Sequence, residues 1–227
     1  MQLFVANSLF TLALISSISV ASAVSTTITT SDNSKHSTVS ISDNISEIAS
    51  PYTVLKTTGT RLFSRISANQ KTIAKFPHLM RDIIEEELMP SIDYRYISYR
   101  ILGKGLNNIS TMQRDDFVEA MRHYLVRTYS NTLSKYKNQD VIFESEKPTK
   151  GKRIVGVKTH IVGQGSPTIQ VVFQMRENKK TKQWKIFDMT VEGISLLSAK
   201  QIELNNKIVR QGIDHVILEL SALAKQR

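Results

Sequence analysis

Cysteine is absent from the 227-residue chain. This absence excludes disulfide bonds, thiol catalysis, thiolate metal sites and a lipid anchor attached to cysteine. After the first 20 residues the chain also has no apolar run long enough to cross a bilayer. Stability must therefore come from a packed core, and the length allows one domain of ordinary size once a removable leader is discounted.

Motifs for metals and nucleotides are absent as well. The histidines stand apart in the sequence, and none of them forms an H-E-x-x-H or H-x-H pattern. Gly103-Lys104-Gly105 has neither the spacing of a phosphate loop nor that of a dinucleotide fingerprint, and we interpret it as a helix end. We therefore expect neither a metal nor another cofactor.

Two further patterns could be taken for catalytic groups. Ser195 is not surrounded by a G-x-S-x-G motif, and we interpret it as the serine that begins a helix. The three carboxylates of Glu85–Glu87 are consecutive, so on a helix they point roughly 100° apart. We interpret them as a solvated helix face, and we expect the protein not to be an enzyme.

The N-terminus has the pattern of a secretory leader. An apolar run from Leu3 to Val20 is followed by Ala21-Ser22-Ala23, which is an A-x-A cleavage pattern. The sequence therefore predicts a signal peptide over residues 1–23 and an exported mature chain. Met1-Gln2 lacks the usual positive charge, so a membrane anchor stays open as the alternative reading of this run.

Residues 24–50 are roughly half serine and threonine, contain no aromatic residue and have only scattered valine and isoleucine side chains. Such a composition does not bury enough surface to offset the entropy of ordering, so we expect a flexible segment there. The remaining residues, 51–227, are predicted to form the domain. The formal net charge of +10 favours anionic surfaces as partners. We do not expect nucleic acid, because the basic residues are not interleaved with aromatic ones.

Hydrophobic periodicity predicts helices, then strands, then helices. Residues 51–102 have a helical period with breaks at Pro77 and Pro90, and Ser110 with Gln113 forms a capping box for a helix that continues to about Tyr136. The period changes to two after Asp140, with strands around 155–161, 169–175 and 184–191. Two further helices are predicted over 196–210 and 213–225. This order predicts an α+β fold with a mainly antiparallel sheet.

The most specific motif is the WKIFDMTVEGIS sequence of Trp184–Ser195. Together with other segments it resembles the MlaC family, the periplasmic phospholipid-binding components of the Mla intermembrane lipid-transport ABC system. The resemblance extends over nearly all of residues 51–227. The other matching segments, in chain order, are Glu87–Pro90, Ile101–Gly103, Gln113-Arg114 with Phe117, Tyr124–Tyr129, Lys200-Gln201 with Glu203, and Gly212–Asp214.

The resemblance implies a helical layer packed on a curved, mainly antiparallel sheet of about four strands. Between them it implies an apolar pocket for acyl chains, with the lipid headgroup facing solvent. We expect apolar side chains of the sheet and the helices to line this pocket. The candidates are Leu62, Ile66, Ile84, Leu88, Ile101, Met121 and Leu125 from the helices, and Val157, Val171, Phe173, Met175, Phe187 and Met189 from the sheet.

By the same resemblance, the protein is expected to be a carrier of diacyl phospholipid in the periplasm. Its implied partners are an outer-membrane lipoprotein complex, an inner-membrane ABC transporter and the membrane-anchored substrate-binding subunit of that transporter. This traffic would maintain the lipid asymmetry of the outer membrane. Two alternatives stay open: a binding protein for a hopanoid or a quinone, and a small enzyme on a similar fold that uses Asp188 as a general base.

Overall fold

The computed structural model describes residues 49–163 and 167–225. The predicted signal peptide lies outside these residues, as does nearly all of the Ser/Thr-rich segment. All described residues belong to one compact unit. None of the helices within these ranges is both long and apolar enough to span a membrane.

The first half of the domain is helical. Pro51 begins the first helix, and the side chain of Ser50 accepts a hydrogen bond from the backbone N–H of Thr53, which caps the helix. Pro77 lies immediately before the second helix and Pro90 lies in a 3₁₀ turn, so both prolines mark breaks as predicted. The elements are α1 (Pro51–Lys75), α2 (His78–Ile83), a π-helical turn η1 (Ile84–Leu88), a 3₁₀ turn η2 (Met89–Ser91), α3 (Tyr94–Leu102) and a 3₁₀ segment η3 (Gly103–Asn108).

Helix α4 (Thr111–Leu133) follows, and its capping box is confirmed. The hydroxyl of Ser110 accepts from the backbone N–H of Gln113, and the side chain of Gln113 accepts from the backbone N–H of Ser110. The helix ends at Leu133, slightly before the expected Tyr136. Gly103 follows the last residue of α3 with a φ of +52°, so the interpretation of the Gly103-Lys104-Gly105 sequence as a helix end is also confirmed.

The second half contains an antiparallel sheet of five strands in the order β1-β2-β3-β4-β5. About four strands were expected and three of them were given residue ranges; β1 at one edge of the sheet and the two-residue β5 beside the end of β4 are the strands without a predicted range. Along β2 the side chains alternate between exposed and buried, as the period of two predicts. The strands are β1 (Asp140–Phe143), β2 (Ile154–Val162), β3 (Ile169–Glu177), β4 (Trp184–Val191) and β5 (Ile194–Ser195).

Two helices close the described chain, α5 (Leu196–Gln211) and α6 (Ile213–Lys225). The hydroxyl of Ser195 accepts from the backbone N–H of Ser198, which confirms that this serine begins a helix. Gly212 separates α5 from α6 with a φ of +83°, a backbone conformation that residues other than glycine rarely adopt. The predicted α+β fold is therefore confirmed.

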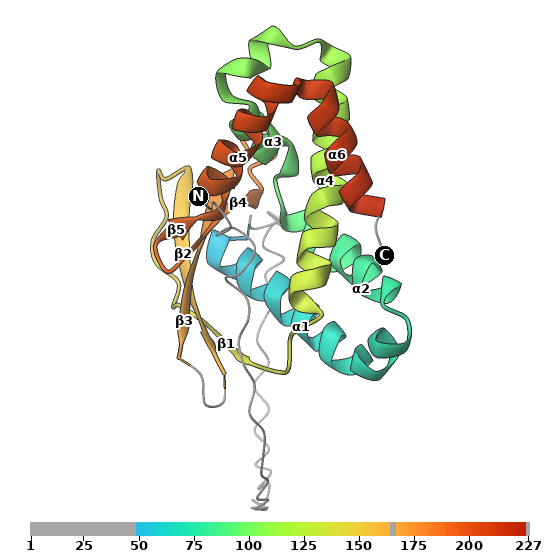
Figure 1. Cartoon of the computed structure of the whole chain (residues 1–227). Helices are drawn as coiled ribbons and strands as arrows, with labels where there is room; N and C mark the ends of the chain where they lie inside the picture. Colours follow the sequence, from blue (N-terminus) through green and yellow to red (C-terminus); the bar gives the residue numbers. More distant parts are fainter. Residues whose placement is uncertain (1–48, 164–166, 226–227) are drawn as a thin grey trace, which may run out of the picture. The chain divides into compact units, whose positions relative to one another are not determined.

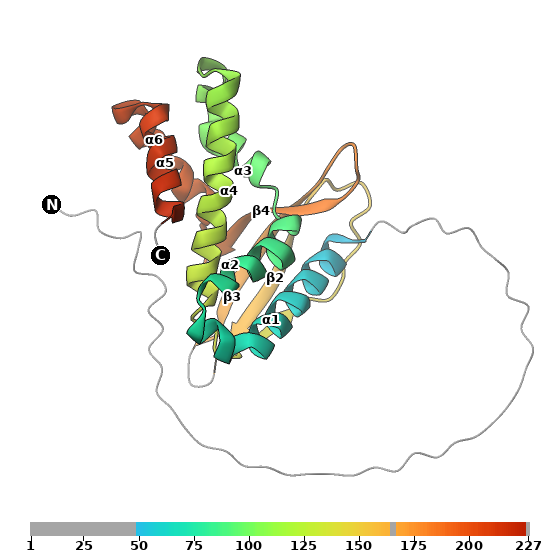
Figure 2. The same cartoon turned by 90° about the vertical axis from the view of Figure 1, so that its right-hand side faces the viewer.

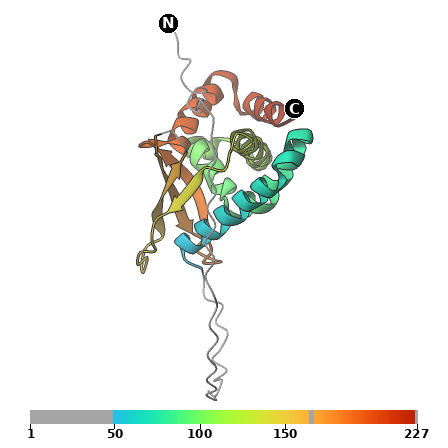
Figure 3. The same cartoon turned by 90° about the horizontal axis from the view of Figure 1, so that it is seen from below.

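The helices lie on one side of the sheet (Figures 1 and 3). Helix α1 contacts β2 and β4 directly (Figure 2), whereas α4 packs against α2, α3 and α6. The core between these layers is almost entirely apolar and includes the fully buried Ile83, Ile84, Ile101, Phe117 and Met175. This arrangement places the inner face of the sheet opposite the helices, where the pocket was expected.

The acidic run was predicted to be a solvated helix face, and this interpretation is wrong for Glu87. Its side chain is only 12% exposed, and its carboxylate forms ion pairs with Arg61 at 2.7 Å and Arg65 at 2.9 Å. Glu86 pairs with Arg65, and Glu85 pairs with Arg122 of α4. The interpretation failed because it assumed a regular helix, whereas these carboxylates lie on a π-helical turn. It also could not include the arginines of α1, which are distant in sequence.

Glu87 is expected to make folding stability depend on pH. The hydrogen bond from Arg65 lowers the pKa of Glu87; desolvation opposes this shift, and Arg61 adds to it. Because the folded-state pKa is lowered, the ion pairs stabilise the protein above the ordinary carboxylate pKa and are lost as the pH falls through the lowered value. We expect Glu87→Gln to reduce the free energy of unfolding by about 1–2 kcal/mol near pH 7, and by less near pH 3.

Urea unfolding at the two pH values measures this difference. The matched control is Glu86→Gln, because the side chain of Glu86 is 59% exposed and a solvated ion pair contributes little to stability. An equal loss of stability for Glu87→Gln at both pH values would contradict the assignment, since protonation would then have no effect on the pair.

Candidate functional site

The register of the sheet brings predicted lining residues into one row. Val157 of β2 lies directly opposite Phe173 of β3, and Phe173 lies opposite Met189 of β4. Val157 is buried, whereas Phe173 and Met189 are only half-buried. In the adjacent row Met175 pairs with Ile186, and both side chains are buried. The inner face therefore passes from closed packing at Met175 to partly accessible apolar surface at Phe173.

A β-bulge interrupts the pairing of β3 with β4 beside this row. Met175 pairs with Ile186 and Gln174 pairs with Asp188, so Phe187 has no direct partner. The ring of Phe187 packs edge-on against Tyr96 of α3, with the ring centres 5.3 Å apart. The bulge thus takes Phe187 out of the simple alternation and brings it against α3.

Helix α4 contributes residues from the other layer. Met121, Leu125 and Tyr129 are spaced four residues apart and share one face of the helix. Met121 is fully buried, and Leu125 and Tyr129 are half-buried and pack against the core. Burial raises the pKa of Tyr129 well above its ordinary range, and the negative charge of Asp188 adds to this rise. The tyrosine thus combines a desolvated hydroxyl with some remaining accessible surface.

The thirteen predicted lining residues fall into three groups. Val171 is buried outside the main core cluster, with its carbonyl accepting a hydrogen bond from the hydroxyl of Thr159. Four others are half-buried: Leu125, Phe173, Phe187 and Met189. The remaining eight lie within the buried core cluster: Leu62, Ile66, Ile84, Leu88, Ile101, Met121, Val157 and Met175.

A polar cluster beside α4 was not among the predicted site residues. The ammonium group of Lys200 lies 4.9 Å from the centre of the Tyr124 ring and donates to Glu203 at 2.6 Å. Desolvation disfavours the charge of Lys200, but Tyr124 and Glu203 outweigh it, so the pKa of Lys200 is raised. These residues occur in the matching segments quoted above, which was the only signal in the sequence that could have selected them.

Asp188, the candidate general base of the enzymatic alternative, has a structural role. One of its carboxylate oxygens accepts from the hydroxyl of Ser195 at 2.6 Å, and the other accepts from the backbone N–H of Leu197 at 2.9 Å. Both bonds tie β4 to the first turn of α5. Within the described ranges, no three His, Asp or Glu side chains come close enough together to hold a metal ion.

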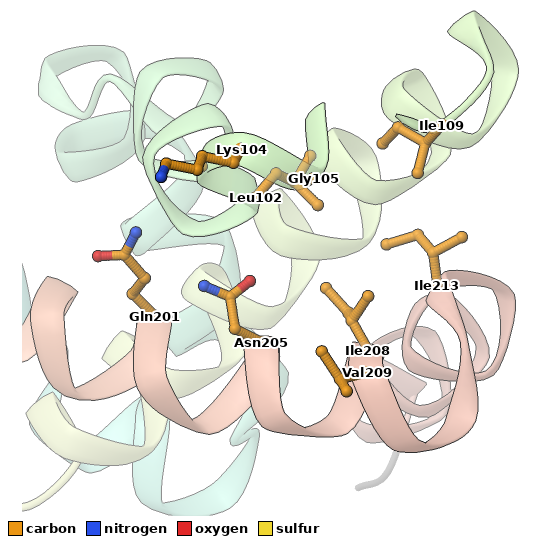
Figure 4. Close-up of a pocket in the computed structure, with 10 residues that line it drawn as sticks. Leu102, Lys104, Gly105, Ile109, Gln201, Asn205, Ile208, Val209 and Ile213 are labelled. Carbon is orange, nitrogen blue, oxygen red and sulfur yellow. The ribbon is translucent and has the colours of Figure 1, made fainter. Parts of the chain in front are cut away.

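A hollow of about 390 Å³ lies elsewhere, between η3 and α5 (Figure 4). None of the thirteen predicted residues lines it. Lys104 and Ile109 face it from one side, and Asn205, Ile208 and Val209 of α5 face it from the other. No residue of the sheet or of α4 lines this hollow.

The chain matches a known protein family. The family model for the MlaC protein matches residues 56–222, which cover all the helices and strands described above except the first turn of α1 and the end of α6. The chain belongs to the MlaC family. The predicted resemblance is therefore confirmed, and the half-buried lining candidates, the Lys200 cluster and the WKIFDMTVEGIS segment all lie within the matched region.

Two relatives cover most of the chain. The intermembrane phospholipid transport system binding protein MlaC of Haemophilus influenzae is 29% identical over 178 residues, which are 78% of this chain and 83% of the relative. A toluene tolerance protein of Pseudomonas putida is 28% identical over 168 residues, covering 72% of this chain and 75% of that protein.

A solved structure has the same fold. The phospholipid-binding protein of Ralstonia solanacearum, determined in complex with a phospholipid, superposes with a TM-score of 0.69 at 15% sequence identity. The match covers 78% of this chain and 97% of the Ralstonia protein. An MlaC-type arrangement of helices on an antiparallel sheet is thus shared with a protein of solved structure.

Proposed function

We propose that this protein carries diacyl phospholipid through the periplasm between an outer-membrane lipoprotein complex and an inner-membrane ABC transporter with its membrane-anchored substrate-binding subunit. The observation that carries the proposal is membership of the MlaC family over residues 56–222. The name of the Haemophilus relative and the phospholipid bound by the Ralstonia protein support it. The signal peptide over residues 1–23 and the flexible segment over 24–50 are parts of the same proposal.

The cargo requires an enclosed apolar site. Withdrawing one methylene group from water contributes about 0.8 kcal/mol, so two long acyl chains need roughly 20 kcal/mol or more of shielding to cross an aqueous space. We assign the direct contacts to the half-buried Leu125, Phe173, Phe187 and Met189, with Tyr129 beside them. The nine fully buried candidates form the walls behind these contacts.

The carrier acts without a chemical step. Asp188 is occupied by two hydrogen bonds that fix the start of α5, which favours a structural role for this carboxylate over that of a base. A passive carrier does not set a direction by itself, so direction comes from the different affinities of its partners and from ATP hydrolysis by the transporter. Delivery and removal of phospholipid by these partners would maintain the asymmetry of the outer membrane.

Native mass spectrometry of the protein purified from the periplasm, followed by organic extraction, tests the proposal. We expect one diacyl phospholipid per protein, with a mixture of headgroups, because apolar burial selects acyl chains more strongly than headgroups. A hopanoid or quinone in its place would support the other binding function. An empty protein would contradict both binding functions.

A further inference from the structure

Helix α5 exposes large apolar side chains on its outer face. Ile202 is 66% exposed and Val209 is 85% exposed. They are seven residues apart, so they point within about 20° of one another around the helix axis and lie about 10 Å apart along it. Exposed apolar residues at this spacing form a stripe, which is a different feature from isolated surface residues.

The stripe borders the hollow between η3 and α5. Val209 lines this hollow together with Ile109, Ile208 and Ile213, so the apolar surface continues from the helix into the depression (Figure 4). Gln201, next to Ile202 in sequence, donates to the backbone carbonyl of Arg100 at 2.7 Å. This bond joins the end of α3 to α5 and fixes the two sides of the hollow.

Three basic residues lie next to the same surface: Lys104 lines the hollow, Arg210 follows Val209, and the backbone carbonyl of Arg100 accepts a hydrogen bond from Gln201. Arg100, Lys104 and Arg210 are exposed, and none of them forms an ion pair with any carboxylate in the described ranges. The exposed carboxylate at the start of α6, Asp214, accepts a hydrogen bond from the side chain of Gln113. We call the surface formed by Arg100, Lys104, Ile202, Val209 and Arg210 the α5 patch. It combines protruding aliphatic groups with positive charge.

We propose that the α5 patch seats the protein on the surface of an anionic phospholipid bilayer. Ile202 and Val209 enter the headgroup region, while the three cations lie near the lipid phosphates. Charge complementarity favours this partner, since the chain as a whole carries a formal net charge of +10 and the patch adds three cations without ion pairs. The inference goes beyond the carrier function, because it concerns the membrane that the protein contacts and not the lipid that it holds.

Vesicle sedimentation tests the charges of the α5 patch. We expect the wild type to bind phosphatidylglycerol vesicles and to bind phosphatidylcholine vesicles much more weakly. Lys104→Glu with Arg210→Glu should weaken binding to phosphatidylglycerol at least about 25-fold, because each of the two lost cations contributes about fivefold near an anionic surface. Lys56→Glu with Lys180→Glu is the matched control. It changes the net charge equally at exposed positions outside the patch, and we expect less than about threefold weakening.

The apolar stripe is tested in the same assay. Ile202→Ser with Val209→Ser should weaken binding about tenfold. Leu218→Ser, at a residue of α6 that is 69% exposed, should change it less than about twofold. Equal weakening by patch and control variants would overturn the proposal. The proposal would also be overturned if the wild type did not bind vesicles and a photocrosslinker at position 209 captured a protein, because the patch would then contact a protein and not a bilayer.

Mass spectrometry of the same preparations separates the two proposals. The patch variants should keep their phospholipid, because no residue of the α5 patch is among the proposed lipid contacts. A wild type that binds vesicles but holds no lipid would contradict the carrier function and leave the membrane-docking proposal standing. A wild type that holds lipid but does not bind vesicles would contradict the membrane-docking proposal and leave the carrier function standing.

Discussion

Phe173→Asp is expected to purify from the periplasm with less than about a tenth of the phospholipid held by the wild type. Phe173 lies between Val157 and Met189 in one row of the inner sheet face and is half-buried, and the proposed carrier function assigns it a direct contact with an acyl chain. A carboxylate at this position would either stay ionised beside hydrocarbon or bind a proton, and both outcomes disfavour the loaded state. A loss of about 1.4 kcal/mol in binding is already tenfold.

Organic extraction with quantitation of lipid per protein measures the effect. The matched control is Ile154→Asp, the same substitution on β2 at a side chain that is 55% exposed on the opposite face of the sheet. It should keep full loading. Far-UV circular dichroism should show both variants folded. If Phe173→Asp stays folded and fully loaded, the acyl chains do not contact this row of the sheet.

The fold could be predicted because its elements have strong local signals. The period of two around Val155–Ile161 follows from one buried face of a strand, and the Ser110–Gln113 box fixes the start of α4 by two hydrogen bonds. Features that depend on distant residues gave no such signal. The bulge at Phe187 appears only in the pairing of β3 with β4, and the burial of Glu87 depends on arginines of α1.

The candidate site was only partly predictable for a related reason. A side chain that packs in a core and one that contacts a bound acyl chain are both apolar and have the same periodicity, so the pattern treats Ile101 and Phe173 alike. Their burial differs, since Ile101 is fully buried and Phe173 is half-buried, and the proposed division into wall and contact residues rests on this difference. The position of Lys200 against Tyr124 joins two helices that are far apart in the sequence, so periodicity within either helix does not show it.

The difference in burial between Ile101 and Phe173 leads to a second prediction, on stability. Ile101→Ala is expected to reduce the free energy of unfolding by about 2–5 kcal/mol, because it leaves a cavity behind a side chain with no exposed surface. The bound phospholipid per folded protein should stay near the wild-type level, since Ile101 lies in the wall and not at the accessible surface. Urea unfolding of the lipid-free protein measures the free energy of unfolding, and quantitation of extracted lipid measures the loading.

Phe173→Ala is the comparison, with the opposite expectation. A half-buried ring loses less packing than a fully buried side chain, so stability should fall by less than in Ile101→Ala. Lipid loading should fall instead, because the ring supplies apolar surface to the chain. If Ile101→Ala lost its lipid while its stability stayed near that of the wild type, the lipid would contact Ile101 directly. Ile101 would then be a contact residue and not part of the wall.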